Sequence, residues 1–183
     1  MTIQATHRER AYELLEGSAG TMHTLTAGRF RRGVGGALER MPLAGLERTV
    51  EVRFGASRPA APGGRPNPRD GRGVREQVLT VRVGYVLGHA GDGVGPEPPE
   101  TVGDTMNGAT VDAVEDRAET DAHDIRACLG EQANWIGLTP DVIDCAPVDE
   151  DGDLQVLTER AVREVRFRFL TWASIPGTYA PTV

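Results

Sequence analysis

The sequence contains no lysine, so all 20 of its basic residues are arginines. The absence is uniform along the chain and accompanies many glycine, alanine, proline and valine residues. It therefore indicates a GC-rich genome rather than arginines selected for bidentate contacts. With 27 acidic residues the net charge is −7 at pH 7, which disfavours a protein that binds nucleic acid over its whole surface.

Aromatic residues make up only 5% of the chain, and cysteine occurs twice. Cys128 and Cys145 lack the spacing of a metal or redox pair, so we expect both to be reduced and buried, as in a cytosolic protein. No apolar run approaches the roughly 18 residues of a membrane span, and the polar stretch Met1 to Glu16 is unlike a signal peptide. The sequence therefore predicts a soluble protein that is made in the cytoplasm and has no membrane partner.

The length of 183 residues fits one domain, 1–183, which is long enough to bury a substantial core. Because aromatic residues are scarce, we expect valine, leucine and alanine to form most of that core. Glycine (23 residues) and proline (12 residues) are plentiful, which indicates long loops. We expect a flexible arm rich in Arg, Pro and Gly at 55–73 and an extended C-terminal tail at 174–183.

Alternating apolar and polar residues predict four strands. Within Glu76–Leu87, for example, Leu79 and Val81 lie on one face while Thr80 and Arg82 lie on the other. The first two strands follow each other along the chain, so we expect them to pair as a hairpin with a long connection. The predicted strands are Arg48–Phe54, Glu76–Leu87, Asp141–Pro147 and Ala161–Trp172, with an ambiguous further segment at Met22–Phe30.

Two helices are predicted, one over Ala5–Glu16 and a longer one with an apolar stripe at helical spacing. A helical turn or two is also expected within Gly33–Met41. The stripe consists of Val111, Val114, Ala118, Ala122, Ile125 and Leu129, and the other faces of this helix are dense in Asp and Glu. The expected fold is α/β of the α+β type, with a mostly antiparallel sheet, helices packed on one face, and long flexible loops.

Charge is distributed unevenly along the chain. Residues 48–75 hold seven Arg against two acidic residues, and residues 92–124 hold ten acidic residues against one Arg. We expect the basic arm of one copy to contact the acidic helix of another, and such unlike contacts close into rings. The predicted interface residues are Arg58, Arg65, Arg69, Arg72, Glu115, Asp116, Glu119 and Asp121. Two alternatives stay open: a solvated helix face with a loop of no function, and an arm that contacts phosphates.

A search for catalytic, cofactor-binding and metal-ligating residues gives none. His123 stands beside Asp124, but neighbours on a helix do not face each other, so a surface histidine is expected. The acidic segment Asp149–Asp153 fails as a calcium loop because the sixth and twelfth positions hold Leu154 and Arg160; a solvated hairpin turn is expected there. The glycines of residues 33–36 lack a Gly-Lys-Ser/Thr ending. We therefore expect no enzyme activity and no cofactor.

Four stretches resemble the tail terminator proteins of long-tailed bacteriophages, the lambda U-like group. They are ERTVEVRFG, EQVLTVRVGYVL, DAHDIRACL and DCAPVDEDGDLQVLTERAVREVRFRFLTW, within Arg48 to Trp172. The chain departs from that family by extra residues around Thr21–Leu46 and in the Arg-rich loop.

The resemblance implies a structural virion protein with no catalytic residues, which forms a hexameric ring that caps the tail tube and joins the tail to the head. Its partners would be further copies of itself, the tail tube protein and a head-completion or neck protein. DNA would pass through the lumen without being recognised by sequence. Such a protein is assembled in the host cytoplasm and ends in the tail or neck of the virion.

Three other interpretations remain. The chain is another neck or tail-completion protein of the same particle, or it is a non-viral, monomeric accessory or ligand-binding domain. The latter would have an apolar pocket between the helix stripe and the sheet. An enzyme with a diffuse site would instead place His89 or His123 in a cleft beside perturbed neighbours.

Overall fold

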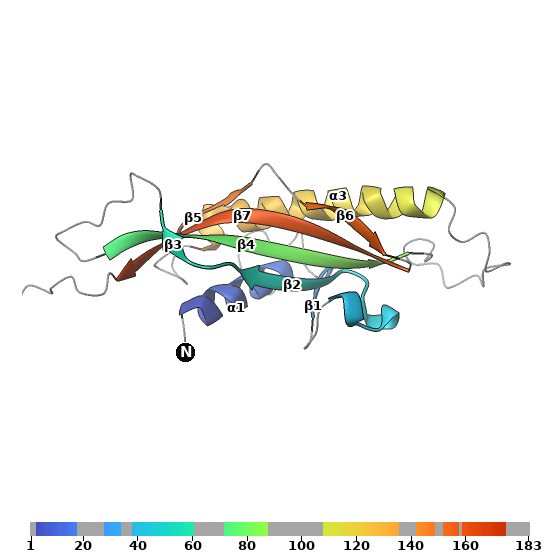
Figure 1. Ribbon diagram of the computed structural model, residues 1–183, viewed down its shortest axis with the longest axis horizontal. Coiled ribbons are helices and arrows are strands. Elements are labelled where there is room, and N and C mark those ends of the chain that lie inside the picture. Colours follow the sequence, from blue (N-terminus) through green and yellow to red (C-terminus); the bar gives the residue numbers. More distant parts are fainter. Residues whose placement is uncertain are drawn as a thin grey trace, which may run out of the picture.

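The computed structural model describes residues 3–17, 28–33, 38–60, 72–87, 108–135, 142–148, 152–157 and 159–174. In this part of the chain, seven strands form one sheet with the order β1-β2-β4-β7-β5, while β3 pairs with β4 and β6 pairs with β7 (Figure 1). The first pair, β1 with β2, is parallel, and the other pairs are antiparallel. The strands are β1 (Arg31–Arg32), β2 (Thr49–Phe54), β3 (Arg58–Pro59), β4 (Arg72–Val86), β5 (Val142–Pro147), β6 (Gly152–Leu157) and β7 (Arg160–Ser174).

The centre of the sheet is the pair β4 and β7, each 15 residues long and in register along its whole length. Side chains alternate between two faces because successive residues of a strand point to opposite sides. One face, here called the inner face, carries most of the core. Its buried residues on these two strands are Leu79, Val81, Val83, Tyr85, Ala161, Val165, Phe167 and Phe169.

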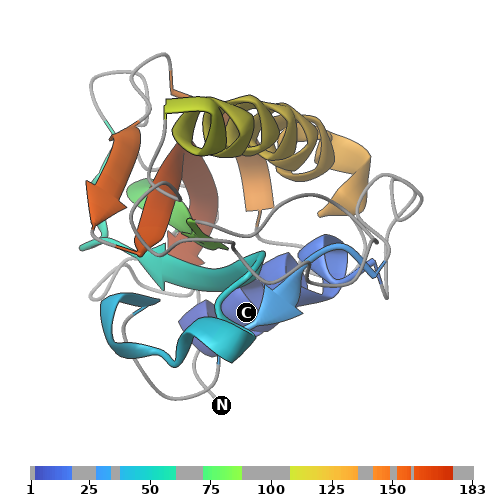
Figure 2. The same cartoon turned by 90° about the vertical axis from the view of Figure 1, so that its right-hand side faces the viewer.

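Two helices, α1 (Ile3–Leu15) and α3 (Gly108–Gly130), cover the inner face. Helix α1 packs beside β2 and α3 beside β7 and β5, as the end-on view shows (Figure 2). The helices also meet, since Cys128 Sγ lies 3.7 Å from the carbonyl oxygen of Leu14. The expected α+β fold, with helices on one face of a mostly antiparallel sheet, is confirmed. The predicted helix stripe is buried except for the half-buried Val111.

A smaller apolar cluster covers one end of the opposite, outer face. It joins Leu46 to Val86 and Val162 with the help of the short 3-10 helices η1 (Leu38–Arg40) and η2 (Leu43–Gly45). Gly84 allows this packing, because a Cβ there would lie 2.5 Å from Leu46 Cδ1. A third 3-10 helix, η3 (Gln132–Asn134), follows α3. No helix or 3-10 helix of the described part of the chain packs on the other end of the outer face.

Most predicted elements are found with shifted ends. Helix α1, strand β2 and helix α3 match their predictions, and β4 begins four residues earlier than expected. The helical turn predicted within Gly33–Met41 is present as η1. For the ambiguous segment Met22–Phe30, residues 28–30 form no strand and the rest lies outside the described residues.

Two predictions of loops are corrected. Arg58 and Pro59, expected in the flexible arm, form β3 against Glu76 and Arg75. Gly152, expected in an acidic turn, instead begins β6 opposite Glu164. The hairpin turn therefore connects β6 to β7, where Leu157 pairs with Arg160. Strands β5 and β6 both pair with the same edge of β7, β5 with residues 167–171 and β6 with residues 160–164. The remainder of the arm and the tail beyond residue 174 lie outside the described residues.

Candidate functional site

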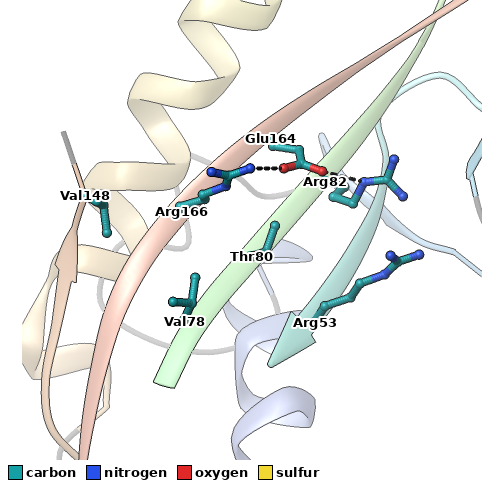
Figure 3. Close-up of a pocket in the computed structure, with 7 residues that line it drawn as sticks. All are labelled: Arg53, Val78, Thr80, Arg82, Val148, Glu164 and Arg166. Carbon is teal, nitrogen blue, oxygen red and sulfur yellow. Dashed lines mark hydrogen bonds and ion pairs between the residues drawn. The ribbon is translucent and has the colours of Figure 1, made fainter. Parts of the chain in front are cut away.

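At its other end the outer face presents described residues of four neighbouring strands, and we call this region the outer sheet surface. Seven of its residues line a shallow hollow of about 440 Å³ (Figure 3). Arg168 and Trp172 extend this surface along β7, since they alternate on the same side as Arg166. The outer sheet surface consists of Arg53, Val78, Thr80, Arg82, Val148, Glu164, Arg166, Arg168 and Trp172.

Exposed apolar side chains make this surface unusual for the solvent face of a sheet. Val78, Val148 and Trp172 are each more than one-third exposed. Val78 stands on β4, and Val148 follows β5, where its backbone N–H donates to the carbonyl oxygen of Arg166 at 2.9 Å. Val78 and Val148 line the same hollow between charged residues, and exposed apolar side chains bordered by charges are typical of surfaces that bind another protein.

Arg82 anchors the centre of the outer sheet surface, with a side chain only 6% exposed. Its Nη1 donates to Glu51 Oε2 at 3.1 Å, its Nε lies 3.1 Å from Glu164 Oε1, and its Nη2 pairs with Glu39. The hydrogen bond from Arg82 lowers the pKa of the Glu39 carboxyl. A buried guanidinium with three carboxylates has a structural role, because its donors are already directed to partners within the chain.

The other arginines of the surface project into solvent. The side chains of Arg53, Arg166 and Arg168 are 52%, 43% and 55% exposed, whereas their respective partners Glu51, Glu164 and Asp144 are 20%, 18% and 40% exposed. The guanidinium groups therefore stand farther out than the carboxylates that they contact. An approaching molecule meets arginine and apolar groups first.

Helix α3 presents a second surface on the opposite side of the sheet. We call it the acidic helix surface: Asp112, Glu115, Asp116 and Glu119. All four are exposed, and at 100° per residue they lie opposite the buried stripe that includes Val114. Glu119 pairs with Arg163 Nη2 at 2.6 Å, whereas the other three have no ion-pair partner among the described residues.

Asp121, which was expected to belong to an intermolecular acidic surface, is completely buried. Arg48 Nε donates to its Oδ2 at 2.9 Å, Tyr85 donates its hydroxyl to the same oxygen at 3.1 Å, and Arg29 lies 3.6 Å from its Oδ1. Burial raises the pKa of Asp121, and Arg48 opposes that shift. Burial and the nearby Asp121 raise the pKa of Tyr85 well above its ordinary value. Asp121 therefore fixes α3 to the sheet and is unavailable to another copy.

The four arginines predicted as arm contacts are only partly described. Arg58 lies on β3, is 71% exposed, and pairs with Glu76 at 3.2 Å. Arg65 and Arg69 lie outside the described residues, and for Arg72 the backbone in β4 is described but the side chain is not. Arg58 thus lies on one side of the sheet, while Glu115, Asp116 and Glu119 lie together on the exposed face of α3 on the other side, so Arg58 contacts none of the three within one copy.

The histidines and cysteines that the sequence singled out form no joint site in the described part of the chain. His123 is exposed on α3, and His89 lies outside the described residues. A further histidine, His7, is buried with its ring centroid 5.2 Å from that of Phe169. Cys128 and Cys145 are buried free thiols, as predicted, and burial raises the pKa of Cys145 well above its ordinary value. Among the described residues no group of His, Cys, Asp and Glu is placed to hold a metal ion, and no helix has the length and hydropathy to cross a membrane.

No protein-family model matches the chain, and none of the curated proteins matches it.

The arginines of the outer sheet surface were not among the interface residues predicted from the sequence. The sequence does show which face of the strand they occupy: Arg166 and Arg168 alternate with Val165 and Phe167, so they lie on the side away from the core. What the sequence did not show was that none of the described elements covers this end of the outer face.

Proposed function

We propose that the chain is a structural subunit that assembles head to tail with copies of itself into a closed ring, and that the ring is a tail terminator of a long-tailed phage. The supporting observation is the presence of two unlike surfaces on opposite sides of one sheet: the acidic helix surface and the outer sheet surface. Contact between unlike surfaces of identical subunits repeats from copy to copy, and it forms a ring when the rotation closes.

The composition of the outer sheet surface suits a protein partner. Tryptophan and arginine are enriched among the residues that contribute most to protein–protein binding, and this surface has both, since Trp172 lies on the same face of β7 as Arg168 and Arg166. The surface also lacks the enclosed shape of a small-molecule site, since its hollow is lined by side chains from β2, β4 and β7 that project outward (Figure 3).

In the virion, the ring would cap the tail tube, stop its growth and provide the surface that joins the tail to the head. Its partners would be the tail tube protein and a head-completion or neck protein. The net charge of −7 suits a lumen through which DNA passes, because attraction to phosphates would slow its movement. The sixfold copy number and the place in the virion rest on the family resemblance alone.

The alternatives differ in what they require of the fold. Another neck or tail-completion protein would use the same two surfaces to form a ring. A monomeric ligand-binding domain would need an apolar pocket between α3 and the sheet, but Val114 and Ile125 of α3 and Phe167 of β7 are fully buried members of one packed core. The geometry therefore favours an assembling subunit.

Electron microscopy of the purified protein, alone and mixed with tail tubes made without it, tests the proposal. We expect rings of uniform diameter, and one ring at an end of each tube. Rings that bind heads but not tubes would instead assign the chain to another neck position. Absence of rings both in free protein and on tubes would contradict the proposed function.

A further inference from the structure

We propose that the outer sheet surface of one copy binds the acidic helix surface of the next copy. This inference rests on the ring assembly proposed above and identifies the two surfaces that would form the ring contact. It replaces the basic arm, as the partner of the acidic helix, with arginines that the sheet holds in fixed positions.

The charges on the two surfaces are complementary. Asp112, Glu115 and Asp116 are exposed and lack an ion-pair partner among the described residues. Across the sheet, Arg53 and Arg168 are more than half exposed. Each guanidinium carries five N–H donors, so an arginine that contacts one carboxylate within the chain still has donors for a bidentate contact with a second one. The unused N–H donors of the outer sheet surface can therefore bind the carboxylates of the acidic helix surface.

The spacing of the charges also agrees. Arg53, Thr80 and Arg166 lie in one row across β2, β4 and β7, which places the two arginines about 10 Å apart because neighbouring strands are about 4.8 Å apart. On α3, Asp112 and Glu119 are two helical turns apart, or about 10.5 Å at a rise of about 1.5 Å per residue. A helix that crosses the strands would thus meet both arginines.

Shape and apolar contact favour the same arrangement. Next to the acidic residues, α3 exposes the short side chains of Ala113 and Thr120. Short side chains allow a helix to approach a sheet closely, so that Val78 and Val148 would lose contact with water on binding. Burial of such groups supplies affinity, whereas the charged pairs set the orientation and the rate of association.

Charge reversal on each surface tests the inference. One variant combines Arg53→Glu with Arg168→Glu, and the other combines Glu115→Arg with Asp116→Arg; all four side chains are exposed, so the fold should be retained. We expect each variant alone to need at least a tenfold higher protein concentration to form the wild-type oligomer, as measured by analytical ultracentrifugation. Circular dichroism and the thermal midpoint check folding. The milder pair Arg53→Gln with Arg168→Gln gives a second measurement, with a smaller shift in the same direction.

Mixing the two reversed variants is the decisive step. In a ring in which the two variants alternate, the reversed outer sheet surface of one variant meets the reversed acidic helix surface of the other. The remaining contacts join two wild-type surfaces. An equimolar mixture should therefore regain the wild-type mass. A matched control, Arg8→Glu with Arg31→Glu, makes the same change in net charge at exposed positions elsewhere and should assemble normally.

Two results would overturn the inference. If the wild type forms rings and the reversed variants form them equally well, the docking surfaces are wrong while ring assembly stands. If the reversed variants fail but their mixture does not recover, the two surfaces do not bind each other. Wild-type protein that forms no ring, even on tail tubes, would refute the proposed function itself.

Discussion

Replacing Arg82 with methionine should destabilise the fold, because this guanidinium holds three carboxylates together on the outer sheet surface. Methionine has a similar length and keeps the contact with neighbouring strands, but it leaves Glu39, Glu51 and Glu164 without their shared cation. Breaking a fully buried ion pair on one side costs about 3–5 kcal/mol. Here the carboxylates retain part of their exposure to water, so we expect a loss of about 2–3 kcal/mol in the free energy of unfolding.

The assay is urea unfolding at a fixed, low protein concentration, because assembly would otherwise add to the apparent stability. At a slope of about 2 kcal/mol per molar urea, the loss shifts the midpoint by about 1–1.5 M. Arg53→Met is the matched control: it removes an arginine from the same surface, but one that is 52% exposed, and it should change the stability by less than about 1 kcal/mol.

The pH dependence of the stability loss in Arg82→Met shows whether the loss comes from the missing charge or from altered packing. Arg82 lowers the pKa of Glu39 in the folded protein, so this interaction stabilises the fold above the ordinary pKa of 4.5 and is lost as the pH falls through the folded value. The deficit of Arg82→Met should therefore be complete at pH 7 and smaller at the lowest pH at which the protein stays folded. A deficit below about 1 kcal/mol at pH 7, or one that does not change with pH, would refute this reasoning.

Further predictions follow from individual contacts. Gly84→Ala should lower stability by about 1–3 kcal/mol in thermal unfolding, since the new Cβ would meet Leu46 at 2.5 Å; an unchanged midpoint would contradict the packing of the smaller cluster. Asp121→Ala should cost about 3 kcal/mol in urea unfolding, whereas Glu115→Ala on the same helix should cost less than about 0.5 kcal/mol; equal effects would mean that Asp121 is not buried. Both thiols should react with a disulfide reagent only after unfolding, because Cys128 and Cys145 are buried; rapid reaction of the native protein would refute this. In Trp172→Phe the remaining indole, Trp135, is fully buried and donates to the Leu129 carbonyl at 2.7 Å, so its fluorescence should be blue-shifted and protected from iodide.

The sequence predicted those parts of the fold that depend on local periodicity. Strand β7 alternates without interruption from Val165 to Phe169, and the α3 stripe repeats every three or four residues, so both elements were found. Strand β6 was missed because its first residues, Gly152 and Asp153, are typical of a turn. Strand β3 was missed because it has only two residues and forms by pairing with the distant Glu76 and Arg75. Pairing between residues far apart in the chain is not encoded in the local pattern.

Burial of single polar residues was harder to predict. Asp121 was counted among the exposed acids of α3, although it lies three residues after Ala118 and four before Ile125, which is the spacing of the buried stripe. The helical position was therefore visible in the sequence. Its partners were not, because Arg48 and Tyr85 come from two different strands that only the folded sheet brings together.

The central claim, that copies of this chain assemble head to tail into a ring, is tested most directly by the mass of the protein in solution. Light scattering on a sizing column, repeated over a range of protein and salt concentrations, gives that mass. We expect one closed oligomer, near six subunits, that dissociates as salt screens the contact between exposed charges. A strict monomer at every protein concentration, at low and at high salt, would contradict the claim for the free protein.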